Sequence, residues 1–170
     1  HRPDALMEAE QIAEAFTTLI TSGKVRHFGV SNFKPTQIQL LQRQLPMPLL
    51  VNQLQFGLAH TSMINSGINI HNDAAINRDS DVLDFCQLHQ ITVQAWSPLQ
   101  FGMFEGNFID HPRYPELNST LARISDHYSV GKSALALAWI LRHPANMQVI
   151  VGSTKASRIE QMAKATTISL

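Results

Sequence analysis

The chain has 170 residues, of which 44% are hydrophobic and 15% charged, a composition typical of a folded globular protein with one core. Its 13 basic residues balance 13 acidic ones, so charge gives no argument for a nucleic-acid or membrane partner, and the longest apolar stretch, residues 134–141, is too short to cross a bilayer. The single cysteine, Cys86, cannot form an internal disulfide and favours a reducing, cytoplasmic location.

The first third of the chain predicts two helices, each followed by a strand. Apolar residues at helical spacing indicate a helix over residues 8–22, with Gly23 as its C-cap, and a strand is expected over residues 25–30. Pro35 opens the next helix, because its missing N–H costs nothing in a first turn. The apolar face expected for that helix consists of Ile38, Leu40 and Leu41. Residues 49–54 form the second predicted strand.

The rest of the chain continues the alternation of helices and strands. Residues 57–79 have no apolar period and are expected to form a long loop. The elements predicted after it are a helix over residues 81–89, a strand over 91–96, a loop over 97–115, helices over 117–128 and 131–143, a strand over 149–151 and a helix over 155–165. The inner face expected for the helix over residues 81–89 comprises Val82, Phe85 and Cys86.

Short, mostly apolar strands that alternate with helices are typical of a parallel sheet whose strands are buried on both faces. The fold class is therefore α/β, either a doubly wound sheet or a (β/α)8 barrel. No strand is followed by a glycine-rich dinucleotide motif or a phosphate-binding loop, which argues against the doubly wound nucleotide folds. Four strands are half of a barrel, which usually needs about 250 residues. Since the chain also opens on His1 rather than Met, we expect it to be truncated at both ends.

Polar and aromatic residues follow each of the four predicted strands, where both α/β architectures place their functional sites. These residues are Ser31, Asn32, Asn52, Gln53, Trp96, Ser97, Gly152, Ser153 and Thr154. Each has an ordinary structural explanation: an N-cap pair for Ser31 and Asn32, a loop anchor for Gln53, a core position for Trp96 and a helix-capping turn for the last three. Together, they form the set of amide, hydroxyl and aromatic groups that would bind a planar ring bearing a carboxamide.

Several segments in order resemble the aldo-keto reductase family. Residues 23–33, Gly-Lys-Val-Arg-His-Phe-Gly-Val-Ser-Asn-Phe, are similar to a signature of that family. Val-Asn-Gln at residues 51–53, Ala-Trp-Ser-Pro-Leu at 95–99 and Ile-Val-Gly-Ser-Thr at 150–154 follow in the family's order. The resemblance covers the whole chain and implies a partial barrel domain over residues 1–170, the second half of a (β/α)8 TIM barrel with its strands 5–8.

The resemblance implies that this half of the barrel binds NADP(H). Ser31, Asn32 and Gln53 would hydrogen-bond the nicotinamide carboxamide, since amide side chains both donate and accept. Trp96 would stack on the nicotinamide ring, and a further pair, Ser97 and Leu99, would lie along the pyrophosphate.

The segment that begins at Gly152 would hold the adenosine end of the cofactor. Ser153 and Thr154 stand where a helix is expected to start and would bind the 2′-phosphate. Arg158 and Gln161 follow Thr154 by four and seven residues, on one helix face, and would contact that phosphate and the adenine. Many members of the family have a lysine where this chain has Gly152, so one charge partner of the phosphate is absent.

Residues 1–4, His-Arg-Pro-Asp, resemble the segment with the family's catalytic histidine, so His1 would orient the carbonyl oxygen. The family's catalytic tyrosine, lysine and aspartate lie upstream of that histidine, outside these 170 residues, and Tyr114 and Tyr128 are in the wrong places to replace the tyrosine. In the family, the loop after the third strand lines the substrate pocket. The apolar residues that would do so here are Phe101, Met103, Phe104 and Phe108, although they could equally pack on their own barrel.

The resemblance therefore implies NADP(H)-dependent reduction of aldehydes or ketones to alcohols. The substrate would be a small carbonyl compound, without a nucleic-acid or membrane partner. Two alternatives remain open: a non-catalytic, NADP-binding regulatory subunit, as in the β-subunits of potassium channels, and an inactive truncated product.

Overall fold

The computed structural model describes residues 1–70, 72–73, 75–103 and 105–170, which separate into two compact units. The first unit comprises residues His1–Leu54 and Ser62–Val93, and the second comprises Gln55–Thr61 and Gln94–Leu170. Among the residues described, no helix is both long and apolar enough to span a bilayer.

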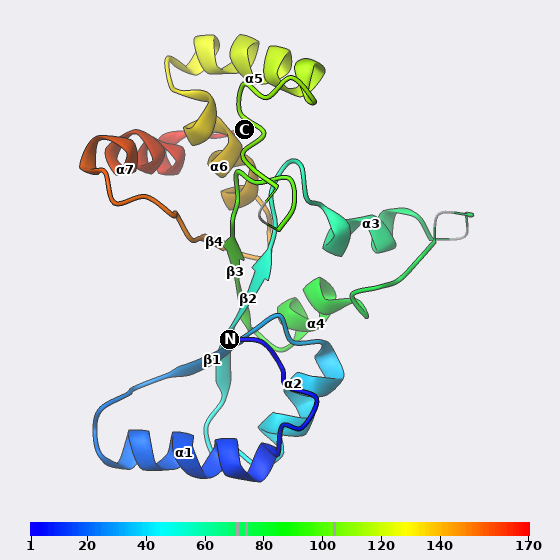
Figure 1. Ribbon diagram of the computed structural model, residues 1–170, viewed down its shortest axis with the longest axis vertical. Coiled ribbons are helices and arrows are strands. Elements are labelled where there is room, and N and C mark those ends of the chain that lie inside the picture. Colours follow the sequence, from blue (N-terminus) through cyan, green and yellow to red (C-terminus); the bar gives the residue numbers. More distant parts are fainter. Residues whose placement is uncertain (71, 74, 104) are drawn as a thin grey trace. The chain divides into compact units, whose positions relative to one another are not determined.

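Seven α-helices, four strands and a short 3-10 helix alternate along the described part of the chain (Figure 1). Their bounds are α1 Ala9–Thr21, β1 Phe28–Ser31, α2 Pro35–Gln42, β2 Leu49–Gln55, α3 Ser62–Ile68, α4 Val82–Leu88, β3 Thr92–Trp96, α5 Pro115–Tyr128, α6 Lys132–Leu141, β4 Gln148–Val149, α7 Ala156–Ala163 and η1 Lys164–Thr167. The predicted order of helices and strands is confirmed, with one additional helix.

In the first unit, β1 and β2 pair in parallel, with Gly29 opposite Val51 and Ser31 opposite Gln53. The two strands come so close at Gly29 that a Cβ atom there would stand 2.7 Å from the Cβ of Val51 and 2.8 Å from its carbonyl oxygen. A glycine is therefore required at this position. The register is irregular between Phe28 and Gly29, just before this close approach.

Helices α1, α2, α3 and α4 complete the first unit: α2 contacts α1 and α4, and α3 contacts α4. The ring of Phe16 in α1 stacks on that of Phe28 in β1, with centroids 3.9 Å apart. Helix α1 ends as predicted, because Gly23 adopts φ +70° and its N–H donates to the carbonyl of Ile20. The buried core of this unit includes Ile38, Leu41, Leu49, Val82, Leu83 and Cys86.

The structure corrects several details of the first unit. Leu40 is 53% exposed, because it lies about 200° around α2 from Ile38 and so on the opposite face of the helix. The first strand begins at Phe28 rather than residue 25. The loop expected over residues 57–79 contains α3, a helix of only seven residues. In α4, Leu83 is buried and belongs to the inner face, whereas Phe85 is half-buried.

In the second unit, β3 and β4 pair in parallel, with Gln94 opposite Gln148 and Ala95 opposite Val149. Strand β4 has only two residues, although the N–H of Ile150 extends the pairing by donating to the carbonyl of Ala95 (2.9 Å). Within β3, Val93 and Ala95 are buried and their neighbours half-buried. The expectation that strands are buried on both faces is therefore wrong for β3, whose side chains alternate between two different environments.

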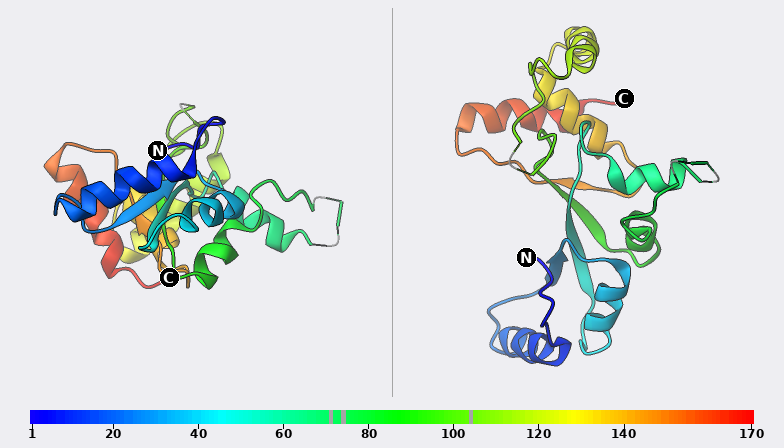
Figure 2. Two further views of the ribbon diagram at one scale, coloured as in Figure 1. Left: turned by 90° about the horizontal axis from the view of Figure 1, so that it is seen from below. Right: turned by 45° about the vertical axis from the view of Figure 1, so that its right-hand side comes forward.

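Helix α6 is the centre of the second unit and contacts α5, α7, η1 and β4 (Figures 1 and 2). Small and aliphatic residues bury most of its surface: Ala134, Leu135, Ala136, Leu137, Ala138 and Ile140. A core of Phe108, Leu121, Leu135 and Ala136 joins this helix to α5 and to the loop after β3. That loop is thereby attached to the most buried helix of its unit.

We predict that Gly29→Ala destabilises the protein by about 1–3 kcal/mol, because the added methyl group would overlap Val51. Chemical denaturation measures the change. Gly67→Ala is the matched control, since no atom lies within 4 Å of its added Cβ and alanine is favoured inside a helix. Equal free energies of unfolding for the two variants would contradict the close approach of β1 and β2.

We also predict that Cys86 reacts with a thiol reagent only when the protein unfolds. The side chain is fully buried, and this burial raises its pKa from the ordinary 9.0 to about 11. A hydrogen bond with the side chain of Asn52 has a smaller effect in the opposite direction. The unfolded chain loses this proton first, so the free energy of unfolding should fall as the pH rises from about 9 to about 11. Reagent uptake with and without denaturant measures the first effect, and rapid labelling of the folded protein would contradict it.

Candidate cofactor site

The exits of β1 and β2 bring Ser31, Asn32 and Gln53 together in the first unit. Because the two strands are parallel, Ser31 at the end of β1 lies opposite Gln53, two residues before the end of β2. The Ser31 hydroxyl and the Asn32 N–H both donate to the carbonyl of Gln53, each at 3.0 Å. The Asn32 side-chain amide in turn donates to the Ser31 hydroxyl oxygen at 3.0 Å. We refer to these three residues as the strand-exit cluster.

This geometry fixes what the Ser31 hydroxyl can offer to a ligand. Its proton is used toward Gln53, and one of its two acceptor positions is used by Asn32. A second acceptor position remains for a donor such as a carboxamide N–H. Asn32 adopts φ +60°, a left-handed conformation that asparagine tolerates better than most residues. It is half-buried between the buried Ser31 and Phe33.

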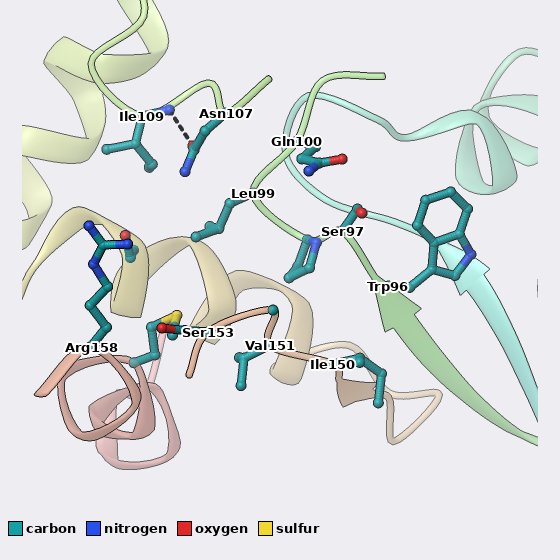
Figure 3. A pocket seen from close by; sticks show the side chains of 14 residues that line it. Trp96, Ser97, Leu99, Gln100, Asn107, Ile109, Ile150, Val151, Ser153 and Arg158 are labelled. Carbon is teal, nitrogen blue, oxygen red and sulfur yellow. Dashed lines mark hydrogen bonds between the residues drawn. The ribbon is translucent and has the colours of Figure 1, made fainter. Parts of the chain in front are cut away.

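The second unit contains a cavity of about 660 Å³ (Figure 3). Four segments supply its walls: the exit of β3 with the loop that follows, the start of α6, the exit of β4 and α7. The residues that line it are Trp96, Ser97, Pro98, Leu99, Gln100, Asn107, Ile109, Ser133, Ile150, Val151, Gly152, Ser153, Arg158 and Met162. The hydroxyl groups and the guanidinium are the polar groups expected around a phosphate, and the aliphatic residues suit a flat organic body.

Backbone contacts fix the exit of β3 at the wall of this cavity. Ser97 has φ +47°, so the chain turns sharply after Trp96. A Cβ atom on Gly57 would collide with the carbonyl group of Pro98, which shows how closely these two backbone segments pack. Across the pair of strands, Ile150 is held by its hydrogen bond to Ala95. Trp96 and Ile150 therefore stand at fixed places on the cavity wall.

Arg158 contributes the positive charge of the cavity. It belongs to the first turn of α7, whose N-cap is Lys155, and its side chain extends from that helix in Figure 3. Within the described part of the chain, no carboxylate forms an ion pair with it. Ser153 holds the backbone just before α7, since its hydroxyl oxygen accepts the N–H of Lys155 at 3.2 Å. A cation and helix N–H groups at one place favour an anion.

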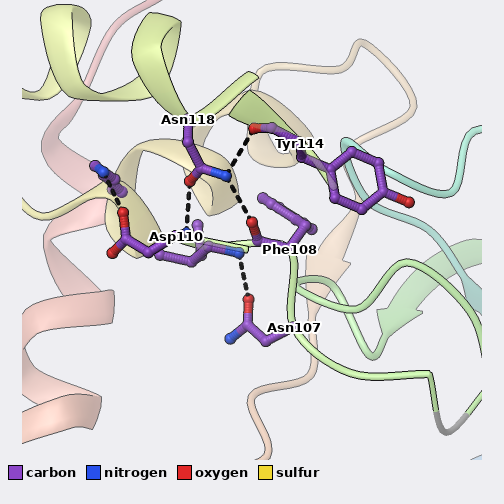
Figure 4. A network of polar contacts seen from close by, with 7 residues as sticks. Asn107, Phe108, Asp110, Tyr114 and Asn118 are labelled. Carbon is purple, nitrogen blue, oxygen red and sulfur yellow. Dashed lines mark hydrogen bonds and ion pairs between the residues drawn. The ribbon is translucent and has the colours of Figure 1, made fainter. Parts of the chain in front are cut away.

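A polar network holds the loop that forms the opposite wall (Figure 4). The side-chain amide of Asn118 donates to the carbonyls of Phe108 (2.8 Å) and Tyr114 (2.9 Å), and its oxygen accepts the N–H of Asp110 (2.7 Å). The Asp110 carboxylate also pairs with Lys132 at the start of α6. The cavity residue Ile109 belongs to this network, because its N–H donates to the side-chain oxygen of Asn107 at 2.8 Å.

The structure brings six of the expected cofactor residues to the cavity: Trp96, Ser97, Leu99, Gly152, Ser153 and Arg158. Thr154 and Gln161 are exposed and are not among its lining residues, because α7 begins at Ala156 and directs Arg158 and Met162 inward instead. His1 is exposed in the first unit, and no hydrogen bond or ion pair between described residues joins it to the strand-exit cluster.

The apolar loop residues expected to line a substrate pocket have different environments. Phe108 is fully buried in the core with Leu121, which agrees with the alternative that it packs on its own domain. The ring of Phe101 packs against Tyr114, with centroids 5.2 Å apart. Met103 is 49% exposed, and Phe104 lies outside the described residues.

Three polar cavity residues were missing from the sequence interpretation: Gln100, Asn107 and Ser133. Asn107 lies far along the loop after β3, and Ser133 lies at the start of α6, so neither stands at a strand exit. A search limited to strand exits therefore could not find them. Gln100 stands one residue beyond the motif that contains Trp96 and could have been included.

Comparisons with known proteins agree with this geometry. The sequence profile of the Aldo/keto reductase family matches residues 1–170. The chain is 35% identical to the oxidoreductase YdhF of Escherichia coli and 33% identical to a 6-dehydroglucose reductase of Agrobacterium fabrum, in each case over all of this chain and 51% of the relative. It spans about half the length of these curated relatives.

A solved structure of an aldo-keto reductase from Klebsiella pneumoniae in complex with NADPH superposes with a TM-score of 0.76 at 26% identity, over all of this chain and 52% of the other. The α/β fold with parallel strands is thus that of the second half of a TIM barrel, as expected. Because the profile covers every residue, the chain belongs to the aldo/keto reductase family.

Proposed function

We propose that this chain is the NADP(H)-binding part of an oxidoreductase that reduces aldehydes or ketones to alcohols. The observation that supports this most directly is the cavity of the second unit, where Arg158 and the hydroxyls of Ser97 and Ser153 line a space shared with aliphatic side chains. The solved relative was crystallised in complex with NADPH, and one curated relative is named a 6-dehydroglucose reductase. The proposed substrate is accordingly a small carbonyl compound.

The groups around the cavity fit the adenosine end of NADP(H). Arg158 is a cation in the first turn of a helix, which suits the 2′-phosphate. Ser153 would donate to the same phosphate, and Gly152 leaves open space, since no atom lies within 4 Å of a Cβ built there. Ser97 and Leu99 would lie along the pyrophosphate. Thr154 and Gln161 are at the exposed edge, where they would contact the phosphate and adenine only from outside the cavity.

The strand-exit cluster fits the opposite end of the cofactor. The open acceptor position of Ser31 would receive a carboxamide N–H, and the side-chain amides of Asn32 and Gln53 would complete the set of donors and acceptors. Trp96 at the exit of β3 would stack on the nicotinamide ring. These contacts would determine which face of the ring meets the substrate.

When bound, NADPH would supply the hydride of the reaction. His1 would orient the carbonyl oxygen on which negative charge develops. The two tyrosines of this chain are engaged elsewhere: Tyr128 donates to the carbonyl of Ser169 at 2.6 Å, and Tyr114 packs on Phe101. Neither lines the cavity. Proton donation to the alkoxide would thus require a group from outside these 170 residues.

We predict that Arg158→Met weakens NADPH binding by about 10- to 100-fold, because a charge-assisted phosphate contact contributes about 1.5–3 kcal/mol. Affinity for NADH, which has no 2′-phosphate, should change less than about twofold. Titration by tryptophan fluorescence measures both. Arg123→Met is the matched control, an exposed helical arginine of the same unit outside the cavity. Equal losses for NADPH and NADH would contradict the assignment of Arg158 to the phosphate.

We further predict that this 170-residue chain binds NADPH without oxidising it when a simple aldehyde is added. The expected result is saturable quenching of tryptophan fluorescence with no steady loss of NADPH absorbance. Turnover comparable to that of a complete aldo-keto reductase would contradict the need for an outside proton donor. If the chain is folded but shows no saturable binding, the proposed function itself is wrong.

A further inference from the structure

Asn52 is a fully buried polar residue in the middle of a motif whose other polar member, Gln53, belongs to the strand-exit cluster. Side chains alternate between the two faces of a strand, so Asn52 and Gln53 point to opposite faces of β2. Asn52 therefore cannot reach a ligand bound by the side chain of Gln53. Any contribution of Asn52 to that site has to act through another residue.

The side-chain amide of Asn52 donates to the carbonyl of Phe33 at 2.9 Å. Phe33 follows Asn32 directly, and the N–H of Asn32 is already bound to the carbonyl of Gln53 at 3.0 Å. Two consecutive residues of β2 thus bind the N–H of Asn32 and the carbonyl of Phe33, the next residue along the chain. The left-handed φ of +60° at Asn32 lies between these two hydrogen bonds.

The position of Asn52 is itself well defined. It lies beside the buried thiol of Cys86 on α4, and a hydrogen bond between the two side chains lowers the Cys86 pKa against the larger effect of burial. No protein group pairs with the Asn52 side-chain oxygen within the described part of the chain. Burying a polar group with one unsatisfied atom is unfavourable, so packing alone would favour an apolar residue here. The hydrogen bond to Phe33 is the feature that an apolar residue could not reproduce.

We propose that Asn52 is a positioning residue that holds Ser31 and Asn32 in the conformation in which they bind a carboxamide. The inference rests on the proposed function. It implies that loss of the Asn52 donor weakens binding of the nicotinamide end of the dinucleotide and leaves binding of the adenosine end unchanged. The cavity that would bind the adenosine end consists of residues of the second unit, and Asn52 is not among them.

The test compares NADPH with 2′-phospho-ADP-ribose, which has the same phosphates but no nicotinamide ring. Asn52→Leu removes the donor and keeps the volume. We expect it to raise the dissociation constant of NADPH roughly five- to tenfold, the effect of one lost hydrogen bond, and to leave that of 2′-phospho-ADP-ribose unchanged within about twofold. Asn52→Asp, which lacks the donor once its buried carboxyl group is ionised, should give the same selective loss at a pH that ionises it.

Asn118→Leu is the matched control, because Asn118 is also a buried asparagine that holds a loop by hydrogen bonds to backbone carbonyls. Its loop forms a wall of the cavity, so this variant should weaken both ligands by the same factor. A general loss of stability would also weaken both ligands equally. The ratio of the two dissociation constants thus separates positioning from a structural role.

A folded Asn52→Leu or Asn52→Asp variant with an unchanged ratio would overturn the proposal. If neither variant folds, the side-chain amide resonances of Asn52 in the unmodified chain decide. They should shift with NADPH and stay in place with 2′-phospho-ADP-ribose, and identical responses to the two ligands would overturn the proposal. Failure of the unmodified chain to bind either ligand would instead refute the proposed function.

Discussion

The carbonyl oxygen of Gln53 accepts two hydrogen bonds, from the Ser31 hydroxyl and the Asn32 N–H, and the conformation of the first unit after β1 depends on this pair. A carbonyl oxygen has two lone pairs, so both are used. The parallel register places Gln53 where it can serve both donors, and Gly29 allows the strands to come close enough for that register. The chain then leaves β1 through a left-handed residue and enters α2 at Pro35.

In the second unit, contacts between distant segments hold the walls of the cavity in place. Its cavity walls come from segments far apart in the sequence, and each is tied to the buried helix α6 or to a strand exit. Asn118 holds the loop before α5, and the ion pair between Lys132 and Asp110 joins that loop to the start of α6. Polar side chains that satisfy backbone groups therefore add to the pairing of β3 with β4 in giving this cavity its form.

Local sequence signals were sufficient for most of the fold. Gly23 and Pro35 mark a helix end and a helix start by their own backbone requirements, and both act as expected. Leu40 shows that an apolar side chain does not by itself predict burial, because its position around the axis of α2 faces outward. Helix α3 was not expected because seven residues are too few to reveal a helical period. The two residues of β4 are too few to fix strand bounds from apolarity alone.

The candidate site was predictable where a strand exit and a motif coincide, as at Trp96 and Ser153. It was not predictable where the cavity depends on tertiary contacts, as at Asn107 and Ser133. Residue spacing placed Arg158 and Gln161 on one face of α7, but only the packing of α7 on α6 decides that Met162 rather than Gln161 turns inward. The rotation of a surface helix about its axis is a property of its neighbours, which sequence spacing does not contain.

The loop after β3 is closed at its base by two backbone hydrogen bonds, from Phe101 to Gly106 and from Phe108 to Leu99. None of the described residues from Gly102 to Gly106 lines the cavity, whereas residues on both sides of this stretch do. An insertion in this stretch would therefore leave the residues that line the cavity in place. Such a loop separates the part of the molecule that is free to diverge from the part that has to stay constant. It is also a natural graft point for an engineer who wishes to add a new recognition segment beside an unaltered cofactor cavity.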